Sequence, residues 1–149
     1  MAPGRYTELF FFDEATALAA GHRPCFECRR VDAVAFAEAW GRAFGLERPP
    51  RAGDMDVILQ GERVDTGGAK RTHPMWLEAL PDAAFYRERV TAEPRMVRGN
   101  LTLAWTAEGY GDPRSRNHGL VEVLTPPCII ATLNAGYRPF VHETAGETV

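Results

Sequence analysis

Two short segments of this chain share one helix-ending pattern, and that pattern constrains the fold more than any other feature of the sequence. Ala20-Gly21-His22-Arg23-Pro24 follows an alanine-rich stretch, and Ala135-Gly136-Tyr137-Arg138-Pro139 follows an apolar stretch. A glycine just beyond a helix adopts the left-handed backbone that closes the last turn, and a nearby proline stops the helix from resuming. The two segments match over too few residues for a repeat architecture. We therefore expect one kind of local helix stop, used twice.

The residues around the first stop predict two helices. Asp13 is placed to cap a helix over Ala15–Ala20, because its carboxylate can accept hydrogen bonds from first-turn N–H groups. A second helix is expected from about Asp32, its cap, to Phe44, because apolar side chains recur there every fourth residue. The first stop therefore forms the connection between two helices.

The second stop ends a further predicted helix over Cys128–Ala135, with Thr125 as its cap and a proline at its first position. Upstream of it, residues 94–98 and 101–106 predict a β-hairpin, because Gly99-Asn100 suits a two-residue turn. Other segments are expected to be strands (6–12, 84–90 and 120–124), a turn (108–113), one or two helical turns (74–80), and a strand or a short helix (55–60).

Charge and hydropathy exclude several classes of protein. The 149 residues include 17 Lys and Arg against 20 Asp and Glu, a formal net charge of −3, which argues against a generally basic nucleic-acid binder but leaves room for a local basic patch. No segment has the apolar length of a membrane span or of a signal-peptide core. We therefore predict a cytoplasmic protein without membrane partners, with reduced thiols.

The cysteines point to a metal site. There are three, so a fully paired intrachain disulfide framework is excluded. Cys25 and Cys28 follow the first helix stop directly, and thiolates at this spacing can both bind one tetrahedral Zn²⁺ at ~2.3 Å. Soft thiolate ligands favour zinc or an iron–sulfur cluster over magnesium or calcium. A pair of core thiols and a redox or nucleophilic dithiol are the alternatives. Cys128 lies on an apolar helix face, which predicts core packing.

The residues around this pair resemble a known zinc domain. Phe11-Phe12-Asp13-Glu14-Ala15-Thr16-Ala17-Leu18-Ala19-Ala20-Gly21-His22-Arg23-Pro24-Cys25-Phe26-Glu27-Cys28-Arg29 is similar to the second half of the zinc-binding domain of the Ada DNA-repair methyltransferases. In that family an aromatic strand leads to an alanine-rich helix, then to glycine, an aromatic residue, Arg-Pro-Cys-x-x-Cys and a basic residue. His22 stands at the aromatic position, which suits ring packing better than metal ligation.

The resemblance also implies what this chain lacks. The family's first ligand pair precedes the strand, which would place it before Met1, and the methyl-accepting cysteine belongs to that pair. Methyl transfer is therefore not supported, and a zinc half-site is what the resemblance implies. We predict a single α+β domain over residues 1–149, in which short N-terminal helices with a zinc-knuckle-like turn (1–46) pack on a small, mostly antiparallel sheet in a β-rich region (52–142).

Two functional hypotheses follow. The first is a small metal-binding, or formerly metal-binding, accessory protein with zinc as cofactor and nucleic acid as a partner. Its metal ligands would be Cys25 and Cys28, with His73 ahead of His118, His142 and Cys128 as a further ligand. Its phosphate contacts would come from basic residues near the turn and in a later loop: Arg23, Arg29, Arg30, Lys70 and Arg71.

The second hypothesis is a small enzyme of unknown reaction. Its pocket would combine His73 and Arg71 with acids such as Asp82, and the cysteine turn would then be purely structural. Neither hypothesis fixes a substrate or an oligomeric state.

Overall fold

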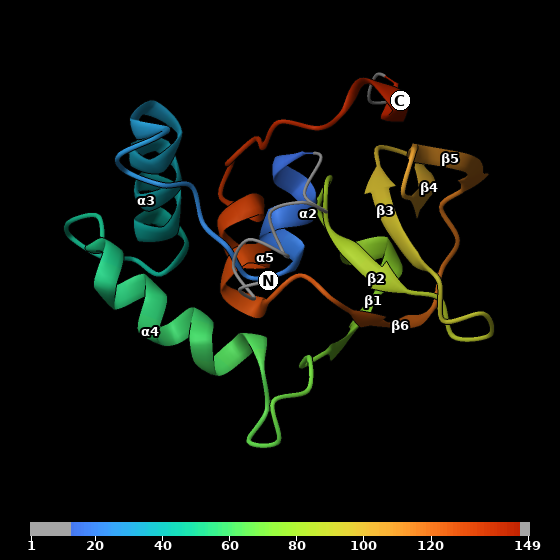
Figure 1. Ribbon diagram of the computed structural model, residues 1–149, viewed down its shortest axis with the longest axis horizontal. Coiled ribbons are helices and arrows are strands. Elements are labelled where there is room, and N and C mark those ends of the chain that lie inside the picture. Colours follow the sequence, from blue (N-terminus) through green and yellow to red (C-terminus); the bar gives the residue numbers. More distant parts are fainter. Residues whose placement is uncertain (1–12, 147–149) are drawn as a thin grey trace.

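A computed structural model describes residues 13–146 (Figure 1). These residues form an α+β fold in which helices pack on an antiparallel sheet, so the predicted fold class is confirmed. The strand predicted over residues 6–12 lies outside the described residues. The helices of the described part are α2 (Glu14–Ala19), α3 (Arg30–Ala43), α4 (Ala52–Arg63) and α5 (Pro127–Asn134), with 3₁₀ turns at Leu77–Ala79 and Glu143–Ala145.

Within residues 13–146 the sheet has six strands in the order β1-β6-β2-β3-β4-β5, and every neighbouring pair is antiparallel. The predicted hairpin is confirmed, because Arg98 pairs with Leu101 across the Gly99-Asn100 turn. The strands are β1 (His73–Trp76), β2 (Phe85–Arg87), β3 (Pro94–Arg98), β4 (Leu101–Thr106), β5 (Gly109–Ser115) and β6 (Leu120–Val123).

Several local predictions were wrong where tertiary pairing decides the structure. Residues 108–113 were expected to be a turn, but β5 begins at Gly109 and pairs with β4, which places Tyr110 in the core. Residues 74–80 begin as a strand, because β1 pairs with β6, and only then form a 3₁₀ turn. The ambiguous segment 55–60 belongs to α4, and Met55 and Leu59, one helical turn apart, are its buried side chains.

Two predicted caps also differ from the structure. Asp13 does cap α2, accepting a hydrogen bond from Thr16 N at 2.8 Å. Helix α3, however, begins two residues before the expected cap Asp32, which lies in its first turn. Thr125 does not cap α5, because its hydroxyl accepts a hydrogen bond from Phe85 N at 2.9 Å. The threonine satisfies a strand N–H in place of a helix N–H.

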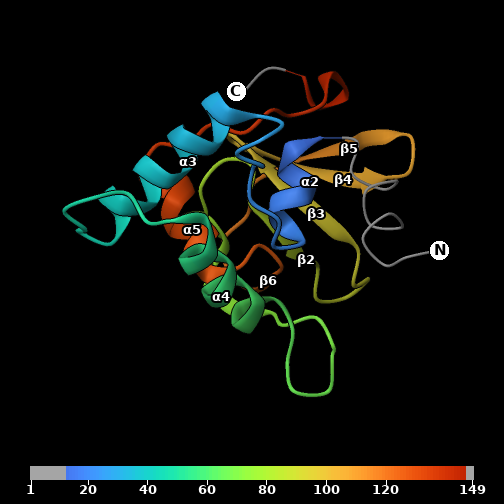
Figure 2. The same ribbon diagram turned by 60° about the vertical axis from the view of Figure 1, so that its left-hand side comes forward.

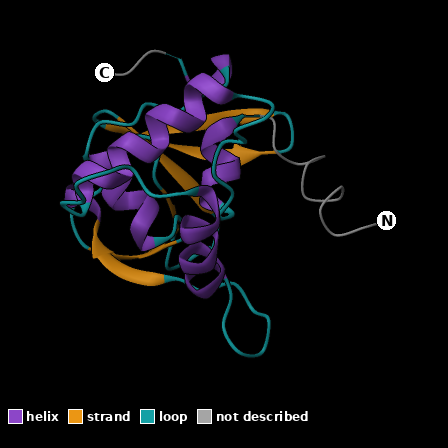
Figure 3. Cartoon of the chain, turned by 90° about the vertical axis from the view of Figure 1, so that its left-hand side faces the viewer, coloured by secondary structure: helices purple, strands orange, loops and turns teal. Residues whose placement is uncertain are grey.

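The helices form two layers beside the sheet. Helices α2 and α5 lie next to the strands, and α3 and α4 lie outside them (Figures 1 and 2). With the helices toward the viewer, the strands lie behind them (Figure 3). Ala15 of α2 packs into the cluster that includes Phe85 and Met96, and Ile130 of α5 packs into the cluster with Val97. A third cluster joins the four helices: Leu18, Phe36, Ala37, Ala39, Trp40, Met55, Leu59, Cys128, Ile129, Leu133 and Tyr137.

Both helix stops form as predicted. The glycine of each has a positive φ, +90° in the first and +111° in the second. In the first stop His22 N donates to Ala17 O at 2.9 Å, and in the second Tyr137 N donates to Thr132 O at 3.3 Å. These are the equivalent hydrogen bonds of one C-terminal capping motif. None of the described helices is long and apolar enough to cross a bilayer.

Candidate functional site

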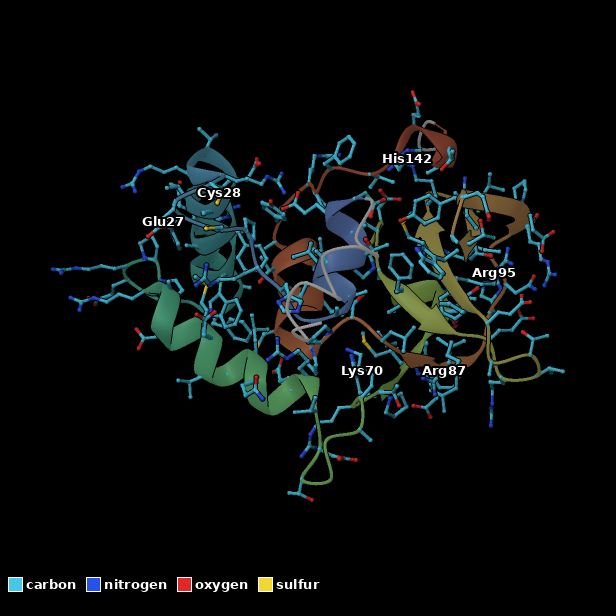
Figure 4. The ribbon with its side chains drawn as sticks, viewed as in Figure 1. Glu27, Cys28, Lys70, Arg87, Arg95 and His142 are labelled. Carbon is cyan, nitrogen blue, oxygen red and sulfur yellow. The ribbon has the colours of Figure 1, made fainter. Side chains whose placement is uncertain are left out.

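Cys25 and Cys28 lie on the exposed turn between α2 and α3, and both thiols are exposed. Arg29 N donates to Cys25 O at 2.8 Å, so the turn runs directly into the first turn of α3. Figure 4 shows Glu27 and Cys28 beside α3, on the side of the molecule away from the sheet. The exposure of both thiols contradicts the alternative of core thiols and leaves the metal half-site and the reactive dithiol.

The turn directs hydrogen-bond donors at one of the two sulfurs. The backbone N–H groups of Cys28 and Glu27 and the Cys28 thiol donate to Cys25 Sγ, and they lower the pKa of Cys25. The negative charge of Glu27 acts in the opposite direction but is the weaker influence. Because these donors stabilise the thiolate more than the thiol, Cys25 is prepared for metal binding or for nucleophilic attack.

Arg23 fixes the turn against helix α4. Its Nε and Nη2 atoms donate to the two carboxylate oxygens of Asp56 at 2.7 and 2.8 Å, and Nη1 donates to Pro24 O at 2.9 Å. The guanidinium also lies over the Phe26 ring, 5.6 Å from its centroid. Arg23, predicted as a phosphate ligand, thus already binds a carboxylate in a bidentate manner. Its position holds the cysteine turn at a defined distance from α4.

A cleft of about 360 Å³ separates the cysteine turn from α4. Its lining includes Cys25, His22 and Asp56, with polar side chains of α4 on the opposite wall. A group bound at Cys25 can therefore be approached from this cleft. The complete lining is Gly21, His22, Arg23, Cys25, Asp56, Leu59, Gln60 and Arg63.

Glu14 supports the turn from beneath and was missed by the sequence analysis. Its carboxylate is buried and accepts hydrogen bonds from Tyr137 Oη, from Phe140 N at 2.9 Å, and from Arg29 Nη2 at 3.3 Å. Burial and the hydrogen bond to Glu14 raise the pKa of Tyr137. Glu14 therefore connects the end of the cysteine turn to the segment that follows the second helix stop.

Asp13, the neighbouring carboxylate, is also buried. Besides capping α2, it accepts hydrogen bonds from Tyr110 Oη at 2.7 Å and from His142 N at 3.0 Å. Burial and the Asp13 charge raise the pKa of Tyr110. The only sequence signal for the role of Asp13 was its position as a helix cap. Its other two partners, Tyr110 and His142, are 97 and 129 residues away along the chain.

Cys128 packs as predicted, but with a polar partner. It is buried at the start of α5, where its Sγ donates to Glu62 Oε2 at 2.9 Å and its backbone N donates to Glu62 Oε1 at 3.0 Å. Burial, together with the hydrogen bond to Glu62, raises the pKa of Cys128 to about 12. This thiol stays protonated at neutral pH and serves the contact between α4 and α5.

The residues predicted to complete a metal or catalytic site are dispersed. His73 Nε2 lies 2.8 Å from Thr125 O, on the β1 edge of the sheet. Asp82 accepts hydrogen bonds from Gly99 N at 2.7 Å and from Arg98 Nη1 at 3.3 Å, near the β3–β4 turn. Among residues 13–146, no three His, Cys, Asp or Glu side chains come together as a metal-binding group.

The predicted basic residues form two separate groups. At the cysteine turn, Arg29 makes ion pairs with Glu14 and Asp32, and Arg30 is exposed. Arg71 and Lys70 lie beyond α4, and Figure 4 shows Lys70 far from Cys28. The structure therefore does not bring the five predicted phosphate ligands into one patch.

Lys70 has neighbours that the sequence analysis did not anticipate. Its Nζ donates to Ala19 O at 2.8 Å, at the end of α2. Burial lowers the pKa of Lys70 to about 8, with Arg63 and Arg87 contributing by charge repulsion. Figure 4 shows Lys70 and Arg87 on the same side of the molecule. Lys70, Arg63 and Arg87 therefore lie close enough for their positive charges to act on one another.

Comparisons with known proteins add no family assignment. No protein-family model matches the chain, and no match was found among curated proteins or among solved structures. The resemblance of residues 11–29 to the Ada zinc domain thus stays a prediction, and the functional interpretation depends on the geometry above.

Proposed function

We propose that this protein is a metal-binding accessory protein, and that Cys25 and Cys28 bind Zn²⁺ through their thiolates. One observation carries the proposal: both thiols are exposed on one turn whose backbone N–H groups point at Cys25 Sγ. Sulfur ligands at this spacing suit zinc better than harder cations. Bound zinc would supply a structural link at the connection between α2 and α3, and the two thiolates would balance its charge.

The surroundings support a rigid half-site. Arg23 and Asp56 hold the turn to α4, and Arg29 is held by Glu14 and Asp32. A metal site needs such outer contacts to keep its ligands oriented. The alternative function, a reactive dithiol, also depends on the lowered pKa of Cys25. Metal analysis is therefore needed to distinguish it from metal binding.

Metal analysis of the purified, folded protein tests the proposal. Equilibration with zinc followed by gel filtration should leave zinc on the wild-type chain and on Cys128→Ser, the matched control that removes the third thiol. Cys25→Ser and Cys28→Ser should each lose the metal. Cobalt(II) should give thiolate-to-metal charge-transfer absorption in the first two proteins alone. Folded wild-type protein that retains neither metal would overturn the proposal.

Nucleic acid is the partner we propose for this protein, on the basis of cations at two positions on it. Arg30 is exposed beside the cysteine turn, and Lys70 lies with Arg63 and Arg87 at a second position. Phosphate binding releases counterions, so affinity for a labelled DNA duplex should fall steeply as salt increases. Fluorescence polarisation at low salt measures it. Arg30→Ala and Arg87→Ala should each weaken binding, and absence of binding at low salt would remove nucleic acid from the proposal.

A further inference from the structure

The cysteine turn offers only half of the ligands that a structural zinc ion requires. A structural zinc ion is bound by four protein ligands in almost every case. All three cysteines and all four histidines of the sequence lie between positions 22 and 142, within the described residues. Of the cysteines, Cys128 is buried in the helical core with its Sγ hydrogen-bonded to Glu62.

The histidines do not supply the missing ligands. His73 is hydrogen-bonded at the β1 edge, and Figure 4 shows His142 apart from Cys28, above the strands. His118 lines a different cavity, on the sheet, together with Tyr86 and Arg95. His22 shares the cleft with Cys25, but within residues 13–146 no group of three metal-binding side chains forms. The turn therefore presents two exposed thiols and leaves two coordination positions of a zinc ion to fill.

The surface beside the turn carries apolar side chains that a partner would cover. Val31 and Val34, three residues apart at the start of α3, are 83% and 38% exposed. Residues at this spacing share one face of a helix, and α3 begins two residues after Cys28. The core of a protein interface is more apolar than its rim, so a partner bound at the turn would cover these two side chains.

The charges of the same surface are self-complementary. Glu27 and Arg30 are both exposed, on either side of Cys28. A twofold axis through the metal brings the same patch of two copies together, so Glu27 of one copy can lie near Arg30 of the other. A zinc ion bound by four thiolates carries a net charge of −2. In the dimer, Arg29 and Arg30 of both copies lie near this negative charge.

We infer that zinc is shared between two copies of this chain, each contributing Cys25 and Cys28 to a four-thiolate site on a twofold axis. The inference rests on the proposed function and adds to it the source of the missing ligands. On binding, the four thiols release four protons to solvent and four sulfur–zinc bonds form, with no change of oxidation state. The apolar face formed by Val31 and Val34 is covered in the dimer.

Zinc content and molar mass measured together test this inference. The chelator-treated chain should be a monomer by light scattering, and zinc should double its mass with half a zinc ion per chain. Cys25→Ser and Cys28→Ser should stay monomeric at any zinc concentration, whereas Cys128→Ser should dimerise like the wild type. Circular dichroism confirms that each variant is folded.

A surface variant separates the metal from the interface. Val31→Glu keeps both thiols but places a charge on the covered face, so we expect at least a tenfold rise in the protein concentration needed for the zinc-linked dimer. A monomer holding one zinc per chain would overturn the shared site and leave the proposed function intact. A folded wild type that binds no zinc would overturn both.

Discussion

The two helix stops begin alike and end in opposite environments. Each has a glycine with positive φ and the same capping hydrogen bonds. Beyond the first, Arg23 pairs with the half-exposed carboxylate of Asp56 and the chain turns outward to present two thiols. Beyond the second, Tyr137 reaches the buried carboxylate of Glu14 and the chain packs over α2 (Figure 1).

The difference shows that a helix stop ends a helix without deciding what the following residues do. At the first stop, the cysteines are additional to the turn, because the second stop forms the same hydrogen bonds with Phe140 in their place. At the second, the backbone of Phe140 donates to Glu14 and accepts from Glu14 N at 3.1 Å. We therefore expect the second stop to contribute stability and the first to carry chemistry.

The largest effect is expected where the second stop meets α2. Glu14→Ala leaves the buried Tyr137 Oη and the part-buried Phe140 N without their acceptor, which should lower the free energy of unfolding by about 2–4 kcal/mol. Tyr137→Phe removes one donor and leaves Glu14 with its other partners, so its cost should be about 1–1.5 kcal/mol. Urea denaturation measures both. A Glu14→Ala variant as stable as the wild type would refute the structural role of the second stop.

The two glycines provide a direct comparison of the stops. Alanine at either position is forced to a positive φ, at a cost of about 1–2 kcal/mol. Gly21→Ala should cost more than Gly136→Ala, because its Cβ would lie 2.7 Å from Arg63 Cδ, whereas the nearest atom at Gly136 is 3.8 Å away. Gly61→Ala is the control, since this helical glycine has open space around it and alanine should stabilise α4 by about 0.5–1 kcal/mol. Thermal unfolding ranks the three variants, and an equal loss at Gly21 and Gly136 would contradict the close approach of Arg63.

The carbonyls at the two helix ends bind different cations, which predicts a pH dependence at one stop only. Lys70 donates to Ala19 O at the first, and Arg42 donates to Ala135 O at 3.1 Å at the second. The pKa of Lys70 is lowered from 10.5 to about 8 in the folded chain, so between these values the unfolded chain binds more protons. The free energy of unfolding contributed by Lys70 should therefore rise with pH from about 8 to 10.5.

Denaturation of the wild type and of Lys70→Met across this range checks the prediction. The free energy of unfolding of the wild type, relative to that of Lys70→Met, should increase as the pH rises from about 8 to 10.5. Arg42→Met should differ from the wild type by a constant amount, because arginine does not titrate there. A constant difference for Lys70→Met would show that its ammonium is not desolvated.

The smallest effect is expected from the arginines of the two stops. Arg23→Ala breaks the pair with Asp56, which is 55% exposed, and should cost about 0.5–1 kcal/mol. Arg138, at the same place in the second stop, is exposed, and its replacement by alanine should change stability by less than about 0.5 kcal/mol. Urea midpoints compare them. A larger loss for Arg138→Ala than for Arg23→Ala would contradict the stabilising effect expected of the pair between Arg23 and Asp56.

The sequence predicted those features that depend on a few neighbouring residues. The helix stops, the Asp13 cap and the Gly99-Asn100 hairpin were correct, because each is fixed by backbone preferences and short-range hydrogen bonds. The α4 segment was ambiguous, since its buried residues are defined by packing against other helices. Strand β5 was missed because its glycines suggested a turn, whereas pairing with β4 determines its conformation.

For the site, the sequence by itself determined that two thiols lie on a turn following a helix stop. Only the tertiary structure decided that these thiols are exposed, that Arg23 is occupied by Asp56, and that Lys70 lies apart from the turn. It also decided that Glu14 is buried, with a partner 123 residues away in Tyr137. The physical reason is the separation along the chain between the residues that determine each feature. Helix ends depend on torsions and contacts within a few residues, whereas burial and ion pairing depend on which distant surfaces meet when the chain folds.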